Sequence, residues 1–435
     1  MSLGLMTIIL IVALFVLLLS GTRIGLSLAI VGIIGFEFIS HLGQTAGAVL
    51  FNSLYSFPLS AIPMFIFMGE IVLRSGLSTM LYRGVTQWIR ILPGGLLHSN
   101  IVSCSIFAAV CGSSPATAAT IGTVAIPEQQ KRGYGKSLVS GSLAAGGTLG
   151  ILIPPSINMI VYGAFVGESV GRLFIGGIIP GITLSLLFMI TIIVASSSNR
   201  TIAPPPEKIT ARYFVDAIVA FKDVWPMLLI IFVIMGAIYG GIMTPTEAAA
   251  IAAFVALVLA AVYKRLTFNV LKGATLSTLE ISAMIFLLFI GANLLGNGLS
   301  MLRIPSQIFE LMSGLGLSST VIWVAVVIIY IIMGTLMDTM AMMLITLPVT
   351  YPLLTVLCGF DPVWFGVQLV ILCEIGMITP PVAINLFVIH GIAPWITMWE
   401  IIKGVWPFVI LMIVLIVLCT LFPEIILFLP TKVLG

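Results

Sequence analysis

Apolar residues fill long stretches of the chain, and short polar turns separate these stretches. Residues 2–20, 24–39, 54–73 and 173–195 each reach or approach the length of about 20 apolar residues that a helix needs to cross a bilayer. No Lys or Arg precedes residues 2–20, so this stretch is interpreted as a membrane span and not as a cleaved signal peptide. The pattern predicts an all-α protein that crosses a membrane many times.

Residues 93–127 are too short for two ordinary spans. They hold one apolar segment at 98–110, a run of small residues and a second short segment at 124–127. Half-length helices that meet at residues 112–115 form a re-entrant hairpin, which enters and leaves on one side of the membrane.

Two similar segments interrupt apolar stretches with paired prolines. Residues 147–158 read GTLGILIPPSIN, and residues 374–385 read EIGMITPPVAIN. Proline has no N–H to donate to the carbonyl four residues back, so Pro154 and Pro380 leave the Gly150 and Gly376 carbonyls without that partner. Each segment predicts a helix that is broken inside the membrane.

The second half of the chain repeats the plan of the first. A shift of 222 residues places Gly69 on Gly291 and Gly94 on Gly316, and the shift drifts to 226 between Pro154 and Pro380. Two structural repeats are predicted, roughly 1–200 and 223–435, each with a hairpin followed by a broken helix. The predicted domains are scaffold helices at 1–92, a transport-domain hairpin and broken helix at 93–166, a span and cytoplasmic linker at 167–223, scaffold helices at 224–313, the second transport-domain hairpin and broken helix at 314–393, and a C-terminal span at 394–435.

Composition supports a membrane location. Hydrophobic residues make up 60% of the 435 residues and charged residues 8%, whereas about a quarter of a soluble domain is charged. The net charge of +3 gives no reason to expect a nucleic-acid partner. The five cysteines lack metal-site spacing and are interpreted as small apolar packing residues.

The basic residues predict the orientation. Five crossings in each repeat and an N-terminus outside place 15 of the 18 Lys and Arg residues inside, and leave only Arg172, Arg303 and Lys432 outside. This asymmetry obeys the positive-inside rule and puts the C-terminus outside as well. Because five is an odd number, the two repeats are inverted relative to each other. Inverted repeats with paired broken helices are typical of secondary transporters.

The broken helices offer oxygen ligands for a coupling ion. Unwound backbone supplies carbonyls that can coordinate sodium without adding a fixed charge to the membrane. The predicted first sodium site consists of Ser113, Ser114, Gly150, Ile153 and Pro154, and the second of Gly334, Thr335, Asp338, Gly376, Thr379 and Val382. The alternative is that these Gly and Pro residues only bend helices for packing.

An organic solute is expected between the two hairpin tips. The candidate substrate-binding residues are Thr117, Thr120, Asn158 and Asn385, and half-helix N-termini nearby would attract a carboxylate. Each Thr has a structural alternative, since a helical Thr often bonds its own backbone. For the two Asn residues, helix capping is the alternative to ligand contact.

Ionisable residues inside spans are candidates for an ion or proton role. Asp338, at the second hairpin tip, is the leading candidate. Glu374 either coordinates an ion directly or forms a hydrogen bond with a neighbouring helix. Glu37, Glu70, Glu247 and Glu280 lie near predicted span ends, where solvation or an Arg partner is expected. No Walker-type motif or catalytic triad pattern occurs, so neither ATP-driven transport nor enzyme activity is expected.

Over nearly its whole length the sequence resembles the large membrane subunit, DctM type, of tripartite ATP-independent periplasmic (TRAP) transporters. The resemblance rests on CGSSPATAATIG, on GTLGILIPPSIN, and on the run in which DPVWFG at 361–366 leads into GMITPP at 376–381. It implies a bacterial inner-membrane protein with periplasmic termini and an elevator mechanism, in which hairpins and broken helices carry solute past a fixed scaffold with sodium. It also agrees with sodium roles for Ser113, Gly150, Pro154, Gly334, Gly376 and Thr379. The second hairpin tip lacks the SSPAT run of the first, so the two ion sites are expected to differ.

The resemblance also implies partners and substrates. These are a periplasmic substrate-binding protein, a small four-helix membrane subunit, and a small organic acid such as a C4-dicarboxylate, sialic acid or another sugar acid. Because the chain starts directly with the first span, the small subunit is expected to be a separate polypeptide. Alternatives are proton coupling through Asp338 or Glu374, and a channel or membrane scaffold. A channel favours a continuous polar pore, whereas here the polar residues gather at two breaks.

Overall fold

The computed structural model describes residues 3–40, 43–199, 202–206, 209, 211–314 and 316–434, and every element in these ranges is a helix. Arg200 and Lys208, two of the basic residues predicted to lie inside, fall outside the described residues. Among the described residues, eight helices are long and apolar enough to cross a membrane. The chain is therefore a multi-pass membrane protein, as the apolar pattern predicts.

The elements of the two repeats follow one another in the same order. The first repeat comprises α1 (Leu3–Leu19), α2 (Ile24–Ser40), α3 (Gly43–Leu54), the 3-10 helix η1 (Phe57–Ser60), α4 (Ala61–Arg74), α5 (Leu77–Ile89), α6 (Leu96–Cys111), α7 (Ser114–Lys131), α8 (Lys136–Leu152), α9 (Ile157–Val166) and α10 (Val170–Ser198). The second comprises α11 (Ala211–Tyr239), α12 (Pro245–Val262), α13 (Phe268–Met301), α14 (Ile304–Gly314), α15 (Ser319–Gly334), α16 (Thr339–Tyr351), the π-helix η2 (Pro352–Leu357), α17 (Pro362–Ile378), α18 (Ile384–Ile392), α19 (Met398–Leu421) and α20 (Glu424–Leu434).

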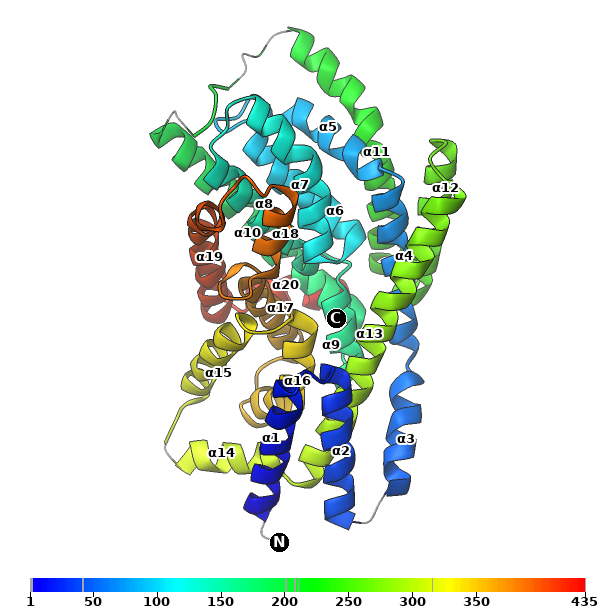
Figure 1. Cartoon of the computed structure of the whole chain (residues 1–435), viewed down its shortest axis with the longest axis vertical. Coiled ribbons are helices and arrows are strands. Elements are labelled where there is room, and N and C mark those ends of the chain that lie inside the picture. Colours follow the sequence, from blue (N-terminus) through cyan, green and yellow to red (C-terminus); the bar gives the residue numbers. More distant parts are fainter. Residues whose placement is uncertain are drawn as a thin grey trace.

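Both predicted hairpins are present and enter from opposite ends of the molecule (Figure 1). α6 and α7 approach the centre from one end, and α15 and α16 from the other. Gly112 ends α6 with φ +63°, a left-handed conformation that glycine adopts at little cost. The second arm of the first hairpin is α7. It spans Ser114–Lys131 and meets α6 at residues 112–115, where the sequence predicts the tip; the Ala-rich run after Pro115 favours a helix.

The two helix breaks lie where the proline pairs predict them. α8 ends at Leu152 and α9 begins at Ile157, while α17 ends at Ile378 and α18 begins at Ile384. Ser156 bridges the first break, since its hydroxyl donates to the Ile151 carbonyl and accepts from the Met159 N–H.

The second break is built differently. It contains one more residue than the first, and the additional turn passes through Ala383, whose φ is +37°. The alanine side chain cannot accept a hydrogen bond, so it does not cap α18 as Ser156 caps α9.

The span predicted at 54–73 is present but starts three residues later, since Phe57–Arg74 is long and apolar enough to cross a membrane. α3 ends at Leu54, and the helical conformation resumes with η1 and continues into α4. Pro58 has no N–H to continue the helix, whereas the corresponding segment of the second repeat, α13, is a single helix of 34 residues. The linker that follows the span at 173–195, within the predicted segment 167–223, is shorter than expected. α10 extends to Ser198, and α11 begins at Ala211.

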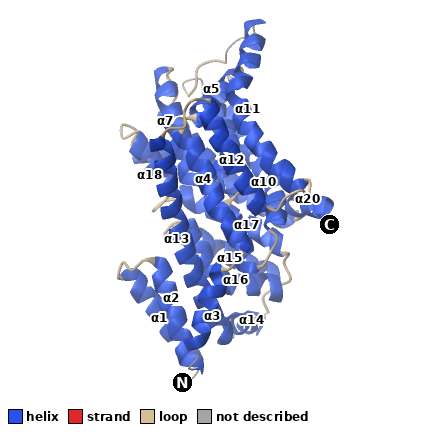
Figure 2. Cartoon of the chain, turned by 90° about the vertical axis from the view of Figure 1, so that its right-hand side faces the viewer, coloured by secondary structure: helices blue, strands red, loops and turns tan. Residues whose placement is uncertain are grey.

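The helices pack as two groups. α2 and α4 both pack on α13, α12 packs on α4, and α5 packs along α11. The second group surrounds α8 and consists of α6, α7, α17, α18 and α19. α8 and α19 approach so closely at Gly141 and Gly404 that a Cβ on either glycine would meet backbone atoms of the other helix. Figure 2 shows α1, α2 and α3 at one end of the long axis and α5 and α11 at the other.

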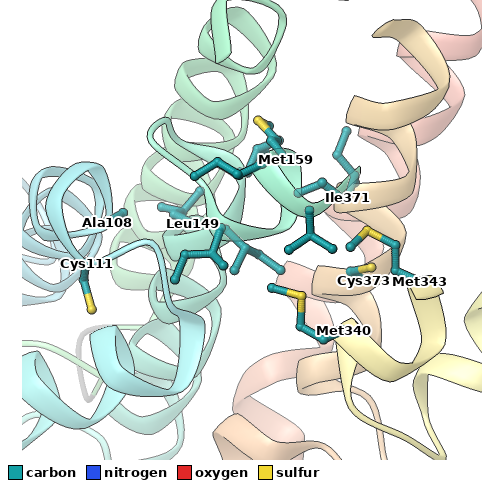
Figure 3. Close-up of a cluster of buried hydrophobic side chains, with 14 of the residues drawn as sticks. Ala108, Cys111, Leu149, Met159, Met340, Met343, Ile371 and Cys373 are labelled. Atoms are coloured by element: carbon teal, nitrogen blue, oxygen red, sulfur yellow. The ribbon is translucent and has the colours of Figure 1, made fainter. Parts of the chain in front are cut away.

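Apolar side chains from both breaks share one core (Figure 3). Leu149 and Met159 flank the first break, and they face Ile371 and Cys373 of α17 and Met340 of α16. Cys104, Cys111, Cys373 and Cys419 are buried without disulfides, as expected for packing residues, while Cys358 is partly exposed.

Candidate functional site

A cavity of about 230 Å³ lies where the two hairpin tips approach α4 and α13. Its lining comprises Ile66, Glu70, Cys111, Gly112, Ser113, Ser114, Pro115, Ala116, Ile151, Ile157, Asn158, Ile281, Met284, Ile285, Asp338, Thr339, Met340 and Met377. The hairpin tips form one wall, as predicted. The opposite wall of α4 and α13 was not predicted.

Three helices begin at this cavity. α7 starts at Ser114, α9 at Ile157 and α16 at Thr339, and the first-turn residues of each helix belong to the lining. The free N–H groups of a helix N-terminus carry about half a positive charge. The Asp338 carboxylate already caps the N-terminus of α16, so the ends of α7 and α9 are the ones that favour an anion in the cavity.

The charged side chains of the lining are both acidic. Glu70 and Asp338 line the cavity, and no Lys or Arg belongs to the lining among the described residues. Glu70 accepts from the Arg74 guanidinium at 2.7 Å, the partner expected for a carboxylate near the end of a span. Asp338 caps α16, because its carboxylate accepts from the Met340 N–H at 3.0 Å. An anionic solute therefore depends on backbone dipoles, and on any cation bound nearby, for electrostatic stabilisation.

The residues predicted for the first sodium site are partly brought together. Gly150 lies against the first hairpin tip, so close that a Cβ there would be 2.7 Å from the Ser113 carbonyl oxygen. Ser113 and Ser114 line the cavity, whereas Ile153 packs toward Gly181 on α10 and Pro154 is buried. The Ser113 carbonyl already accepts from the Thr117 hydroxyl at 2.7 Å.

The second predicted site repeats this arrangement. A Cβ on Gly376 would lie 2.6 Å from the Gly334 carbonyl oxygen, so the second hairpin tip packs on its own broken helix as the first does. The Val382 N–H donates to the Thr335 carbonyl at 3.0 Å and joins the tip to the break. The Thr379 hydroxyl donates back to Ile375 at 2.7 Å. These residues lie at one junction, with Asp338 at its cavity side.

The four predicted substrate residues have different positions. Asn158 lines the cavity, and its side-chain NH₂ is buried without a hydrogen-bond partner among the described residues. Asn385 donates to the Ser114 hydroxyl at 2.8 Å and to the Ala144 carbonyl at 3.0 Å, so it ties the second break to the first hairpin. Thr117 and Thr120 lie outside the lining and donate to their own helix, at Ser113 and Ala116.

Glu374 lies in the packed core between the repeats. Its side chain is fully buried, and neither carboxylate oxygen has a hydrogen-bond partner within the part of the chain that the structure describes. The backbone of Leu152, at the end of α8, is close by. The carboxyl group therefore faces the end of a neighbouring helix, and its two predicted roles stay predictions.

The role of Glu70 in the cavity was missed. Its i, i+4 spacing to Arg74 suggests an ordinary ion pair on the surface of a helix, and that pair is present. Only the packing of α4 against the hairpins brings Glu70 to the cavity, and sequence spacing carries no signal for such a contact.

Proteins with similar sequences are transporter permeases. The chain is 34% identical over 453 residues to the C4-dicarboxylate TRAP transporter large permease protein DctM of Vibrio cholerae, covering 97% of this chain and 98% of that one. It is 35% identical to the isethionate TRAP transporter permease protein DctMQ of Oleidesulfovibrio alaskensis, covering 95% of this chain and 64% of that one. It is 29% identical to the sialic acid TRAP transporter permease protein SiaT of Haemophilus influenzae, covering 95% of this chain and 67% of that one.

A solved structure shares the fold. The crystal structure of the Alcanivorax borkumensis YdaH transporter superposes with a TM-score of 0.61 at 15% identity, covering 88% of this chain and 89% of that one. The sequence profile described as "Tripartite ATP-independent periplasmic transporter, DctM component" matches residues 11–425. With matching motifs, matching fold and a profile that covers nearly the whole chain, this protein belongs to the DctM family of TRAP transporter large permease components.

Proposed function

We propose that this chain is the permease subunit of a sodium-coupled secondary transporter that imports a small organic acid. The carrying observation is the cavity at the hairpin tips, where three helix N-termini meet and where no Lys or Arg of the described residues contributes to the lining. Such a site attracts a carboxylate through backbone dipoles. Its own side-chain charges, from Glu70 and Asp338, oppose an anion.

Sodium coupling would offset the negative charges of Glu70 and Asp338 in the cavity. Each hairpin tip packs on a helix break at a glycine, Gly150 or Gly376, where proline leaves a backbone carbonyl without its helical partner. Carbonyls at these two junctions are suitable sodium ligands, and both junctions border the cavity. A sodium ion at either junction offsets the negative side chains, so ion and anion favour each other's binding.

An elevator motion is consistent with the two groups of helices. The cavity lies between the hairpins and breaks on one side and α4 and α13 on the other. Movement of the first group past the second would expose the cavity to opposite sides of the membrane in turn. In this proposal the previously predicted transport domain, 93–166 and 314–393, is the moving part, and α10 and α19 accompany it because they pack on α8 and α17.

The cavity size favours a compact substrate. Its volume of about 230 Å³ is below the 300–1,000 Å³ typical of pockets for drug-sized ligands. Among the solutes named for the relatives, a C4-dicarboxylate or isethionate fits this volume better than sialic acid does. We therefore propose a C4-dicarboxylate or a similarly compact acid.

The partners and orientation follow from the family. TRAP permeases are inner-membrane proteins that work with a periplasmic binding protein and a small membrane subunit. For this chain we propose both partners, with the N-terminus and C-terminus on the periplasmic side, as the basic residues predict.

Uptake into proteoliposomes tests this function. The chain is reconstituted with its small subunit and cognate binding protein, and labelled C4-dicarboxylate, isethionate and sialic acid are compared with and without an inward sodium gradient. We expect saturable uptake of one compact acid that requires the gradient. Uptake that persists at equal sodium and is abolished by a protonophore would overturn sodium coupling, and unsaturable ion flux would indicate a channel.

Proton coupling is a second candidate because Glu374 is buried and its carboxylate has no hydrogen-bond partner among the described residues. An ionised carboxylate in this position costs several kcal/mol, and protonation removes that cost. Glu374→Gln keeps the shape of the neutral acid but cannot exchange a proton. A sodium-driven cycle should retain most uptake in this variant, whereas a cycle driven by protons through Glu374 should stop.

A further inference from the structure

A second cavity, of about 340 Å³, lies between α5 and α7, away from the hairpin tips. Arg83 on α5 forms one side, and Lys131 and Arg132 at the end of α7 form the other. All three basic side chains are exposed at the surface. Basic side chains from α5 and α7 therefore line the same surface cavity.

The positive charge is only partly compensated. Glu128 is the one acidic residue in the lining, and it pairs with Arg132 at 2.8 Å. Arg83 and Lys131 make no ion pair within the part of the chain that the structure describes. Two uncompensated cations on opposite walls attract an anionic group that can reach both.

The rest of the lining is suited to an amphiphile. Val124 and Pro127 on α7 contribute apolar surface beside the basic rim, and Thr86 and Thr123 contribute hydroxyl groups. A free phosphate uses only the charged rim. A phospholipid also covers the apolar surface with its glycerol and first acyl carbons, and basic pockets between membrane helices bind such headgroups.

The cavity joins the two groups of helices. α5 is fixed to α11, since Arg90 pairs with Asp216 at 2.9 Å and the Trp88 indole donates to the Ala217 carbonyl at 2.9 Å. α7 packs against α8 and α18. Beside the cavity the two helices touch directly, where Gln129 donates to the Tyr82 hydroxyl at 3.0 Å.

We propose that this cavity binds the phosphate headgroup of an anionic phospholipid, held by Arg83 from one side and Lys131 from the other. The lipid bridges α5 and α7 at the membrane surface and braces the contact between Tyr82 and Gln129. The proposal rests on this cavity alone and does not depend on the transported solute.

Lipid binding to the full chain tests the proposal. The protein is exchanged into mixtures of phosphatidylcholine and phosphatidylglycerol, and bound lipid is counted by native mass spectrometry. We expect the Arg83→Gln/Lys131→Gln double variant to bind phosphatidylglycerol about thirtyfold more weakly than the native chain. The matched control is Lys222→Gln/Lys272→Gln, which removes the same charge from exposed residues outside the cavity and should leave binding unchanged.

Three outcomes overturn the proposal. Equal lipid retention by the double variant and the native chain is the first, and an equal loss in the control is the second. The third is displacement of the lipid by inorganic phosphate at comparable concentration, which would identify a soluble anion as the ligand. If the double variant misfolds, the charge-preserving Arg83→Lys/Lys131→Arg variant should still bind the lipid, and its failure to do so would also contradict the proposal.

Discussion

At the scale of single residues, two glycines control how closely each hairpin tip approaches its broken helix. Gly150 packs on Ser113 and Gly376 packs on Gly334, in both cases at distances that leave no room for a side chain. The sequence predicts both glycines from their spacing to the paired prolines. It does not predict what they touch, because Ser113 and Gly334 reach them through tertiary packing.

Alanine at either glycine should push the hairpin tip away. The added Cβ of Gly150→Ala or Gly376→Ala meets backbone at 2.7 or 2.6 Å, and backbone yields less easily than a side chain. Overpacking of this kind costs about 1–3 kcal/mol, so we expect a lower melting temperature and weaker dependence of uptake on sodium.

Gly236→Ala on α11 is the control for this pair. A Cβ there meets no atom closer than 4.0 Å, so the change should raise stability by about 0.5–1 kcal/mol through improved helix propensity. A melting temperature for Gly150→Ala and Gly376→Ala equal to that of Gly236→Ala would contradict the close packing at the tips.

At the scale of helices, the start of α9 is fixed by one side chain. Ser156 caps the helix and also donates to the Ile151 carbonyl across the break, so it holds the α9 N-terminus at the cavity. The sequence predicts the break through Pro154. The hydrogen bond from the Met159 N–H to Ser156 is seen only in the folded structure. In the second repeat the corresponding turn passes through Ala383, which has a left-handed conformation and no capping side chain.

Ser156→Ala should weaken solute binding as well as stability. Loss of an N-cap costs about 1 kcal/mol, and the loosened helix end should reduce solute affinity about two- to fivefold. Ser169→Ala is the matched control, because Ser169 caps α10 in the same way but α10, unlike α9, contributes no described residue to the cavity lining. Calorimetry and uptake kinetics separate the two variants, and an equal loss of affinity in both would contradict a specific role for the α9 N-terminus.

At the scale of the whole molecule, one buried amide joins the second break to the first hairpin tip. Asn385 follows the second break and donates to Ser114 at the first hairpin tip, 271 residues away in sequence. Both groups are buried, so the bond is not exchanged easily for water. The link couples the two predicted ion junctions through one hydrogen bond.

A double-mutant cycle should detect this link. We expect Asn385→Ala and Ser114→Ala to couple by about 1 kcal/mol in the free energy of unfolding, since either change alone breaks the same bond. Ser114→Ala combined with Ser169→Ala should be additive. Additivity in the first pair would show that the Asn385–Ser114 bond does not contribute to stability.

The sequence by itself determined the helices, the hairpins and the breaks, because these depend on chain-local properties. Apolar length sets the spans, Gly112 permits the tip of the first hairpin, and the missing N–H groups of Pro154 and Pro380 end helices wherever the rest of the chain lies.

Only the tertiary structure decided which groups meet at the cavity. Glu70 lies in the cavity wall, Glu374 is buried without a hydrogen-bond partner among the described residues, and Asn385 bonds to Ser114. Each of these placements depends on segments far apart in sequence. Such contacts depend on how whole helices pack, and one chain's local residue pattern carries no record of that packing.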